Sequence, residues 1–194
     1  MMRNTKAREQ VLNTAERLFH ERGYNAVSMR AIAEALEIRQ SSLYYHVPNG
    51  KEQLFVEITE RGLQRHRKGL DDVIAQAEPE IEAQLLAASQ WLVDHAPLKL
   101  LSMLENDMPV ISYENAQKLT YMAYQCFFAP IAELFKQAID KGEIRALDPN
   151  QLAGHFLSMM DGISYTTTTG YTPVPMSELA EEIISILLNG ARAK

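Results

Sequence analysis

The sequence has little of what marks secreted, membrane-spanning or disulfide-stabilised proteins. Cys126 is the only cysteine among 194 residues, so no intramolecular disulfide can form. No run of about 18 apolar residues is present, which predicts that no segment spans a membrane. The first residues, Met1–Glu9, are too polar for a secretory signal. Together these absences predict a protein of the reducing cytoplasm.

Motifs for catalysis or metal binding are also missing. The five histidines show no zinc-ligand spacing, and His20-Glu21 lacks the second histidine of a metalloprotease helix. There is no phosphate-binding glycine loop and no Gly-x-Ser-x-Gly, and Asp94-His95 is an isolated pair. Cys126 has no base placed to activate it. We therefore expect no enzyme activity, no metal and no cofactor.

The charges are distributed unevenly along the chain. Residues 1–70 carry twelve lysines and arginines against eight acidic residues, whereas residues 71–194 carry seven against seventeen. A basic N-terminal part on an acidic remainder suggests that the first part binds a polyanion. Chance clustering of surface charge explains the same counts equally well, so the charge alone does not decide.

Apolar residues near the N-terminus recur every three or four positions, the period of an amphipathic helix. Gly23 is expected to end the first helix and Ser28 to cap the second. Pro48-Asn49-Gly50 is expected to end the third. The expected helices are 5–22, 28–36, 39–46 and a long one that opens at Lys51. The expected inward-facing residues are Ala7, Val11, Ala15, Leu18, Phe19, Ile32, Ala33, Leu36, Leu43, Leu54, Phe55, Ile58 and Leu63.

The remainder of the chain shows the same helical period. Pro130 is expected to kink or break a long helix, Gly142 to end it, and Asp148-Pro149 to cap the next. The expected elements are a helix through Ile81–Leu92, a short segment around Leu98–Asn106, a helix over 112–141, a helix through Leu152–Ile163 and a last helix over Leu179–Leu188. The sequence therefore predicts an all-α fold of about nine helices.

The segment from Ser28 to Lys51 carries the clearest functional signal. Two short helices joined by a tight turn bury little apolar surface alone, so they need the first and fourth helices to complete a small core. This arrangement leaves one face of the third helix exposed to solvent. That face is polar but has few formal charges, unlike a helix face built only for solubility. Its serine and glutamine side chains can bond base edges, and its tyrosine and histidine side chains can reach phosphates. The residues on it are Arg39, Gln40, Ser41, Ser42, Tyr45 and His46.

This segment resembles the DNA-binding domain of the tetracycline-repressor (TetR) family over about residues 5–55. The matching residues are Gly23-Tyr24, Ile32-Ala33-Glu34, Ile38, Ser42-Leu43-Tyr44-Tyr45-His46-Val47-Pro48 and Lys51-Glu52-Gln53-Leu54. A second, weaker likeness follows in Ala138, Gly142-Glu143-Ile144-Arg145, Asp148-Pro149 and Asp161-Gly162. The resemblance implies a helix-turn-helix DNA-binding domain over residues 1–50 and a helical ligand-binding and dimerisation domain over 51–194.

The resemblance also implies roles for individual residues. The third helix would enter the major groove with its first residues nearest the bases, and Ser28 and Lys51 would hold phosphates at helix N-termini. The implied DNA-binding residues are Ser28, Arg39, Gln40, Ser41, Ser42, Tyr44, Tyr45, His46 and Lys51. Each also has a purely structural reading: Ser28 as a helix cap, Tyr44 as part of the core and Arg39 as a solvated side chain.

Two positions depart from the family pattern. Many relatives have glycine where this chain has Glu37, and a left-handed glutamate there would cost about 1–2 kcal/mol. The sequence leaves open whether the turn changes shape or the glutamate adopts that conformation. Many relatives have a small capping hydroxyl where Arg39 stands. Arg39 cannot cap the third helix in that way, but it can reach a phosphate or a guanine.

A helix-turn-helix protein of this kind reads its site as a two-fold dimer, and the last two helices are the expected interface. Small residues four positions apart on the first of them permit close approach, and the last helix is apolar on more than one face. The expected interface residues are Leu152, Gly154, Phe156, Ser158, Met160, Gly162, Leu179, Ile183, Ile186 and Leu187. The alternative is that both helices belong to the chain's own core.

Relatives hold a small-molecule effector between the DNA-binding and dimerisation regions, and this chain has adaptable and aromatic residues there. An apolar or aromatic effector is expected at Trp91, Met103, Met108, Tyr121, Tyr124, Phe128 and Met159, although each could simply fill the core. The function implied is a cytoplasmic repressor that binds a palindromic operator in duplex DNA and is released by the effector. Two alternatives stay open: an architectural or cell-division factor bound to DNA, and a helical small-molecule sensor that no longer binds DNA.

Overall fold

The computed structural model describes residues 3–95 and 103–191 of the chain. Within these ranges the regular elements are helical, nine of them α-helices, and there is no β-strand. The described residues form two compact units. The first, here called the head, comprises residues 3–62 and 103–121; the second, here called the body, comprises residues 63–95 and 122–191. The expected all-α fold is confirmed.

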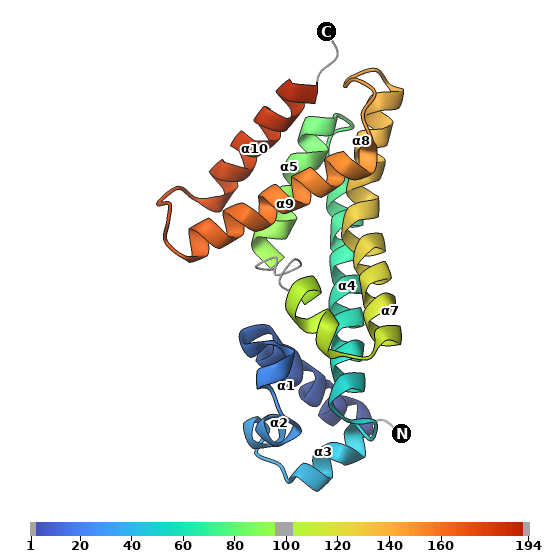
Figure 1. Cartoon of the computed structure of the whole chain (residues 1–194), viewed down its shortest axis with the longest axis vertical. Coiled ribbons are helices and arrows are strands. Elements are labelled where there is room, and N and C mark those ends of the chain that lie inside the picture. The colour runs from blue at the N-terminus through green and yellow to red at the C-terminus, as the bar shows by residue number, and fades with distance from the viewer. Residues whose placement is uncertain (1–2, 96–102, 192–194) are drawn as a thin grey trace. The chain divides into compact units, whose positions relative to one another are not determined.

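Helix α1 (Arg3–Ala26) supplies the first wall of the head (Figure 1). Four of the five expected stripe residues are buried, namely Val11, Ala15, Leu18 and Phe19, together with Leu12, whereas the expected Ala7 is half-buried. Gly23 has φ 75° and ψ 166°, so the helix is interrupted where the sequence predicts its end. One further turn nevertheless follows to Ala26, because the N–H of Tyr24 donates to the Asp107 carboxylate at 2.9 Å instead of to the preceding turn.

Helices α2 (Met29–Ala35) and α3 (Gln40–His46) form the helix-turn-helix pair. Ser28 Oγ accepts the N–H of Ala31 at 3.1 Å, which confirms that Ser28 caps α2. Glu37 follows α2 with φ 54°, in the left-handed region. The N–H of Ile38 donates to Ala33 and that of Glu37 to Glu34, the two bonds of a Schellman motif. The turn thus keeps its left-handed geometry, and the glutamate bears the strain.

Helix α4 (Gly50–Gln76) begins one residue before the expected start, at Gly50, which itself has φ 80°. The four residues expected on its inward side are all buried: Leu54, Phe55, Ile58 and Leu63. Its residues up to Gly62 belong to the head, and the later ones belong to the body. The single helix therefore supplies core to both units.

The head is completed by a segment from the middle of the chain. Residues Met103–Asp107 form a π-helical turn, η1, and Met108–Val110 form a 3-10 turn, η2. Helix α7 (Tyr113–Ala123) follows, and its residues up to Tyr121 belong to the head. The short element expected around Leu98–Asn106 lies partly outside the described residues.

The body contains α5 (Ile81–His95), α8 (Ala129–Asp140), α9 (Pro149–Thr168) and α10 (Met176–Ala191). Helix α9 packs against α5, α8 and α10 (Figure 1). The largest fully buried side chains include Leu92, Ile131, Phe135, Phe156 and Met160. Asp148 Oδ1 accepts the N–H groups of Asn150 and Gln151, which confirms the predicted cap of α9. No helix in the described part of the chain is long and apolar enough to span a membrane.

The helix expected over 112–141 is helical without a gap from Tyr113 to Asp140, but its hydrogen-bond pattern changes near the expected proline. Between α7 and α8 lies a π-helical turn, η3 (Tyr124–Phe128), and Pro130 stands in the first turn of α8. A proline provides no N–H for the preceding turn, so the hydrogen-bond pattern must change just upstream of it. Arg67 Nη1 donates to the carbonyl oxygen of Gln125 at 2.7 Å, within that turn. The change of hydrogen-bond pattern therefore begins several residues before the proline itself.

Candidate nucleic-acid interface

Helix α3 presents a polar face to solvent and is anchored from below by two apolar residues. Leu43 is completely buried and Val47 nearly so. The residues on the outer face are Gln40, Ser41, Ser42, Tyr44 and Tyr45, all exposed. Tyr45 is 73% exposed and Tyr44 is 42% exposed, so neither ring belongs to the core. Both rings are therefore available for contact with another molecule, beside the exposed serine and glutamine side chains.

Arg39 lies at the N-terminus of α3. Its side chain makes no capping hydrogen bond, while its carbonyl oxygen accepts the N–H groups of Ser42 and Leu43. The guanidinium group is exposed and forms no ion pair with the described residues. It is therefore available for a phosphate or for a guanine edge.

His46 ends α3 in a half-buried position. Its ring packs edge-on against Tyr45, with 5.4 Å between ring centroids. Its Nδ1 atom is buried and has no hydrogen-bond partner among the described residues.

Lys51 lies in the first turn of α4, and its ammonium group sits 4.0 Å from the centroid of the Tyr24 ring. Burial lowers the pKa of Lys51, and burial followed by the neighbouring Glu52 raises the pKa of Tyr24. Sequence reasoning expected Lys51 near DNA but missed its aromatic support. The two residues are 27 positions apart, and only the Gly23-Tyr24 pair preceding the helix-turn-helix hinted at a shared site.

Most arginines of the head are already paired with carboxylates. The pairs are Arg8–Glu57, Arg17–Glu21, Arg30–Glu34 and Arg61–Glu9, with separations of 2.7 to 3.1 Å. The basic excess read from the sequence is thus partly neutralised within the head itself. Arg39 and Lys51, which flank α3 in the chain, form no ion pair with a described residue.

The residues expected to hold an effector are divided between the two units. Met103, Met108 and Tyr121 belong to the head, where Met108 is buried and Tyr121 is exposed. Trp91, Tyr124, Phe128 and Met159 belong to the body. Tyr124 stacks on Phe128, and its hydroxyl donates to Asn150 at 2.8 Å. Trp91 stacks on His95, and the two ring centroids are 3.5 Å apart.

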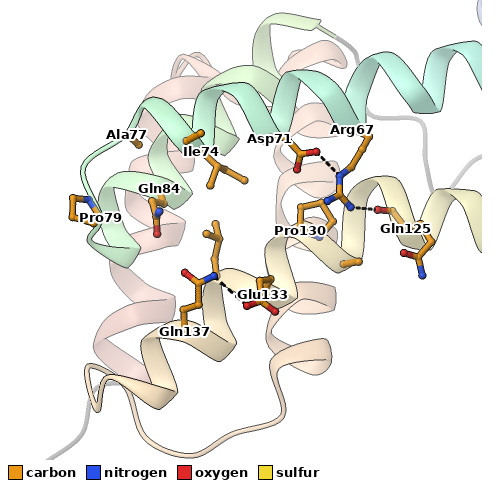
Figure 2. A pocket seen from close by; sticks show the side chains of 13 residues that line it. Arg67, Asp71, Ile74, Ala77, Pro79, Gln84, Gln125, Pro130, Glu133 and Gln137 are labelled. Carbon is orange, nitrogen blue, oxygen red and sulfur yellow. Dashed lines mark hydrogen bonds and ion pairs between the residues drawn. The ribbon is translucent and has the colours of Figure 1, made fainter.

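An open groove of about 610 Å³ lies in the body, between the second half of α4, the start of α5 and α8 (Figure 2). None of the expected effector residues lines it. Its arginine, Arg67, is held by Asp71 and by the carbonyl of Gln125, and Glu133 accepts from Gln137. Because these polar groups already have partners, the groove offers a ligand few unsatisfied contacts.

The expected dimer residues separate into an outer and an inner set. Gly154, Ser158 and Gly162 lie on the more exposed side of α9, and Ile186 on α10 is 63% exposed. Leu179, Ile183 and Leu187 are half-buried. The inner set consists of Leu152, Phe156 and Met160, which pack in the body's own core, with Phe156 at 0% exposure. The expectation that these three contact a second chain is corrected, because their own chain already covers them.

A short helix with an exposed polar face, anchored by a second short helix across a left-handed turn, defines the class of helix-turn-helix DNA-binding proteins. Residues 11–58 match the family model of the tetR family of bacterial regulatory proteins, so this chain carries the DNA-binding domain of that family. The curated relatives that it matches are HTH-type transcriptional regulators.

A curated relative and two solved structures illustrate the similarity. The HTH-type transcriptional regulator YxaF of Bacillus subtilis is 28% identical over 190 residues, which cover 91% of this chain and 93% of that protein. A regulator from Saccharomonospora viridis, solved with choline, has a TM-score of 0.80 at 18% identity and covers 98% and 100% of the two chains. AibR, solved with isovaleryl coenzyme A and operator DNA, has a TM-score of 0.73 at 24% identity, with 93% and 97% covered. The two structures share the fold of this chain.

Proposed function

We propose that this regulator is a repressor that binds a palindromic operator as a homodimer and leaves it when a small molecule binds. The observation that carries the proposal is the outer face of α3, where exposed glutamine, serine and tyrosine side chains stand over the buried anchor Leu43. Its output is then DNA binding rather than catalysis. AibR, which has the same fold, has been solved in complex with operator DNA.

The exposed residues have chemically distinct roles in this proposal. Gln40, Ser41 and Ser42 in the first turn of α3 bond base edges, and Arg39 bonds a guanine or a phosphate. Tyr44, Tyr45 and His46 contact the sugar-phosphate backbone. Ser28 and Lys51, each at the N-terminus of a helix, hold phosphates, which the helix dipole also attracts.

The proposed dimer uses the outer surfaces of α9 and α10. Gly154, Ser158 and Gly162 form a strip of small residues that allows close approach of a second helix. Leu179, Ile183, Ile186 and Leu187 add the apolar area. The two α3 helices would then read half-sites about 34–36 Å apart, or a multiple of that distance.

The proposed effector is apolar or aromatic and binds in the body near Trp91, Tyr124, Phe128 and Met159. The indole Nε1 of Trp91 is buried and has no hydrogen-bond partner among the described residues, so an acceptor on the effector would satisfy it. Two proteins of this fold have been solved with choline and with isovaleryl coenzyme A. An effector acts only if it binds the DNA-bound and free conformations unequally.

The test is the binding of the full-length protein to duplex DNA from upstream of its own gene, compared with random duplex. We expect tight binding to one palindromic site. Gln40→Ala should weaken binding to that site by about 1–3 kcal/mol and relax the preference at one base pair. Glu114→Ala, which changes an exposed residue of α7, is the matched control and should bind like wild type.

The opposite result is equally informative. If no fragment is preferred over random duplex, or if Gln40→Ala leaves the base preference unchanged, the proposed reading face is wrong. The helical small-molecule sensor would then become the better description of this chain.

A further inference from the structure

Asp107 contacts a backbone group 83 positions away in the chain. Its Oδ1 atom accepts the N–H of Tyr24 at 2.9 Å, immediately after the interruption of α1 at Gly23. The interruption removes this N–H from the hydrogen bonds of the preceding helical turn. A carboxylate that accepts a backbone N–H forms a strong, directional bond. Asp107 therefore fixes the backbone of Tyr24 from outside the helix.

The Tyr24 ring is held on further sides by aromatic neighbours. Phe55 meets it edge-on with 5.0 Å between centroids, and Phe19 stacks alongside at 6.0 Å. With its backbone held by Asp107 and its ring held by two phenylalanines, Tyr24 has little freedom to turn.

The remaining face of the Tyr24 ring supports Lys51. The Lys51 ammonium nitrogen lies 4.0 Å from the ring centroid, well within the range of a cation–π contact. A lysine side chain has four rotatable bonds and is usually disordered in solvent, so a fixed aromatic support restricts where its charge can be. Lys51 lies in the first turn of α4, five positions after the last residue of α3.

The segment that carries Asp107 has a second attachment beside Lys51. Glu52 Oε1 accepts the backbone N–H of Ser112 at 3.0 Å and the side-chain amide of Asn115 at 2.7 Å. These hydrogen bonds lower the pKa of Glu52. Residues 107–115 are thus bonded both to Tyr24 and to the residue next to Lys51, and all of these residues lie in the head.

We propose that Asp107 is a positioning residue for DNA binding, which holds Tyr24 in place so that Lys51 is fixed for contact with a DNA phosphate. The proposal rests on the proposed function, in which Lys51 binds phosphate. The inference goes beyond the proposed function because it assigns control of the Lys51–phosphate contact to Asp107, a residue of the η1 turn outside the helix-turn-helix.

The test is the salt dependence of binding of the full-length protein to a labelled random duplex of about 30 base pairs, which requires no knowledge of the operator. A substitution at Lys51 removes two phosphate contacts from the proposed homodimer, one in each subunit, and so reduces the slope of log K against log salt by about 1.8. If the two proteins bind equally at about 1 M salt, this change makes binding roughly thirtyfold weaker at about 0.15 M. We expect this loss for Lys51→Met, for Asp107→Ala and for the double variant, with no further loss on combination.

Two additional variants separate positioning from general stability. Asp107→Asn keeps a side-chain oxygen that accepts the Tyr24 N–H, so it should retain the wild-type slope. Glu105→Ala changes an exposed carboxylate of the same turn and should also retain it. Tyr24→Leu keeps the hydrogen bond to Asp107 but removes the ring, so it should lose the same slope as Lys51→Met.

The proposal is overturned if Asp107→Ala lowers the melting temperature but keeps the salt slope of Glu105→Ala. It is also overturned if Tyr24→Leu binds with the wild-type slope, a comparison that holds even if Asp107→Ala does not fold. If the wild-type protein binds duplex DNA with no salt dependence, the proposed function fails and this inference fails with it. Normal wild-type binding with unaltered slopes in the variants overturns only the positioning role.

Discussion

The indole ring of Trp91 on α5 lies directly against the backbone of Gly69 on α4. A Cβ atom at position 69 would stand 1.8 Å from Cζ2 of Trp91 and 2.2 Å from its Cε2. Real carbon atoms do not approach so closely, so this contact requires a residue without a side chain. Gly69 is buried and has helical backbone geometry, which means that close packing and not an unusual φ accounts for the glycine.

Gly69→Ala should therefore destabilise the protein even though alanine favours helix. Overpacking a close contact costs about 1–3 kcal/mol, which exceeds the gain of about 0.5–1 kcal/mol from replacing a helical glycine. Denaturant unfolding measures the loss. Trp91 is the only tryptophan, so its fluorescence should also change. Gly190→Ala, where a Cβ meets nothing within 4 Å, is the control and should lose no stability.

Glu37→Gly should stabilise the protein. Glu37 is the only non-glycine residue with positive φ in the described part of the chain, whereas the equivalent motifs after α8 and α9 use Gly142 and Gly170. Relieving the left-handed glutamate gains about 1 kcal/mol after allowance for the extra freedom of glycine in the unfolded state. Gly142→Ala should lose a similar amount. Equal denaturation midpoints for wild type and Glu37→Gly would show that the turn carries no strain.

The Glu52 carboxylate should make part of the head's stability depend on pH. Hydrogen bonds from Ser112 and then Asn115 hold its pKa below the ordinary value of 4.5. A depressed folded-state pKa means that the stabilisation is complete above pH 4.5 and is lost as the pH falls through the lower, folded-state pKa. The stability advantage of wild type over Glu52→Gln, measured by urea unfolding, should shrink below pH 4.5. An advantage constant down to pH 3 would exclude the carboxylate as its source.

Ile186→Asp should dissociate the proposed dimer without unfolding its subunits. Ile186 is 63% exposed in the single chain, so the charge enters water in the monomer but is buried in a dimer. Sedimentation velocity should show half the mass, with unchanged helical content. Phe156→Ala is the contrasting variant: this fully buried ring should cost about 3–5 kcal/mol of folding stability on truncation. If the Ile186→Asp variant remains a dimer, the dimer interface does not include Ile186.

The correct sequence predictions are those that depend on neighbouring residues. Ser28 and Asp148 cap their helices because a side-chain oxygen reaches an N–H two or three residues ahead. The inward positions of α1 and α4 follow from the helical period alone. Pro130 marks the π-helical turn between α7 and α8 because a proline alters the hydrogen bonds of its own helix wherever it stands. The exposed face of α3 could be read for the same reason, since Leu43 identifies the side that must be buried.

The predictions that failed concern whether an apolar residue is covered by its own chain or by a second chain. Leu152, Phe156 and Met160 have the spacing of an interface stripe, and the same spacing serves a helix packed within its own chain. Periodicity shows that a side is apolar but does not identify its partner. The extra turn of α1 beyond Gly23 was missed for a related reason, because its supporting carboxylate, Asp107, is distant in the sequence.

The sequence by itself determined the helical fold, the helix caps and breaks, and the polar face of α3, because each follows from contacts within about one helical turn. Tertiary structure alone decided that residues 103–121 belong with the head, that Lys51 rests on Tyr24 and that Trp91 covers Gly69. It also decided that Glu37 accepts a left-handed conformation rather than reshaping the turn. These features depend on groups far apart in the chain, and their free energy appears only when packing brings them together.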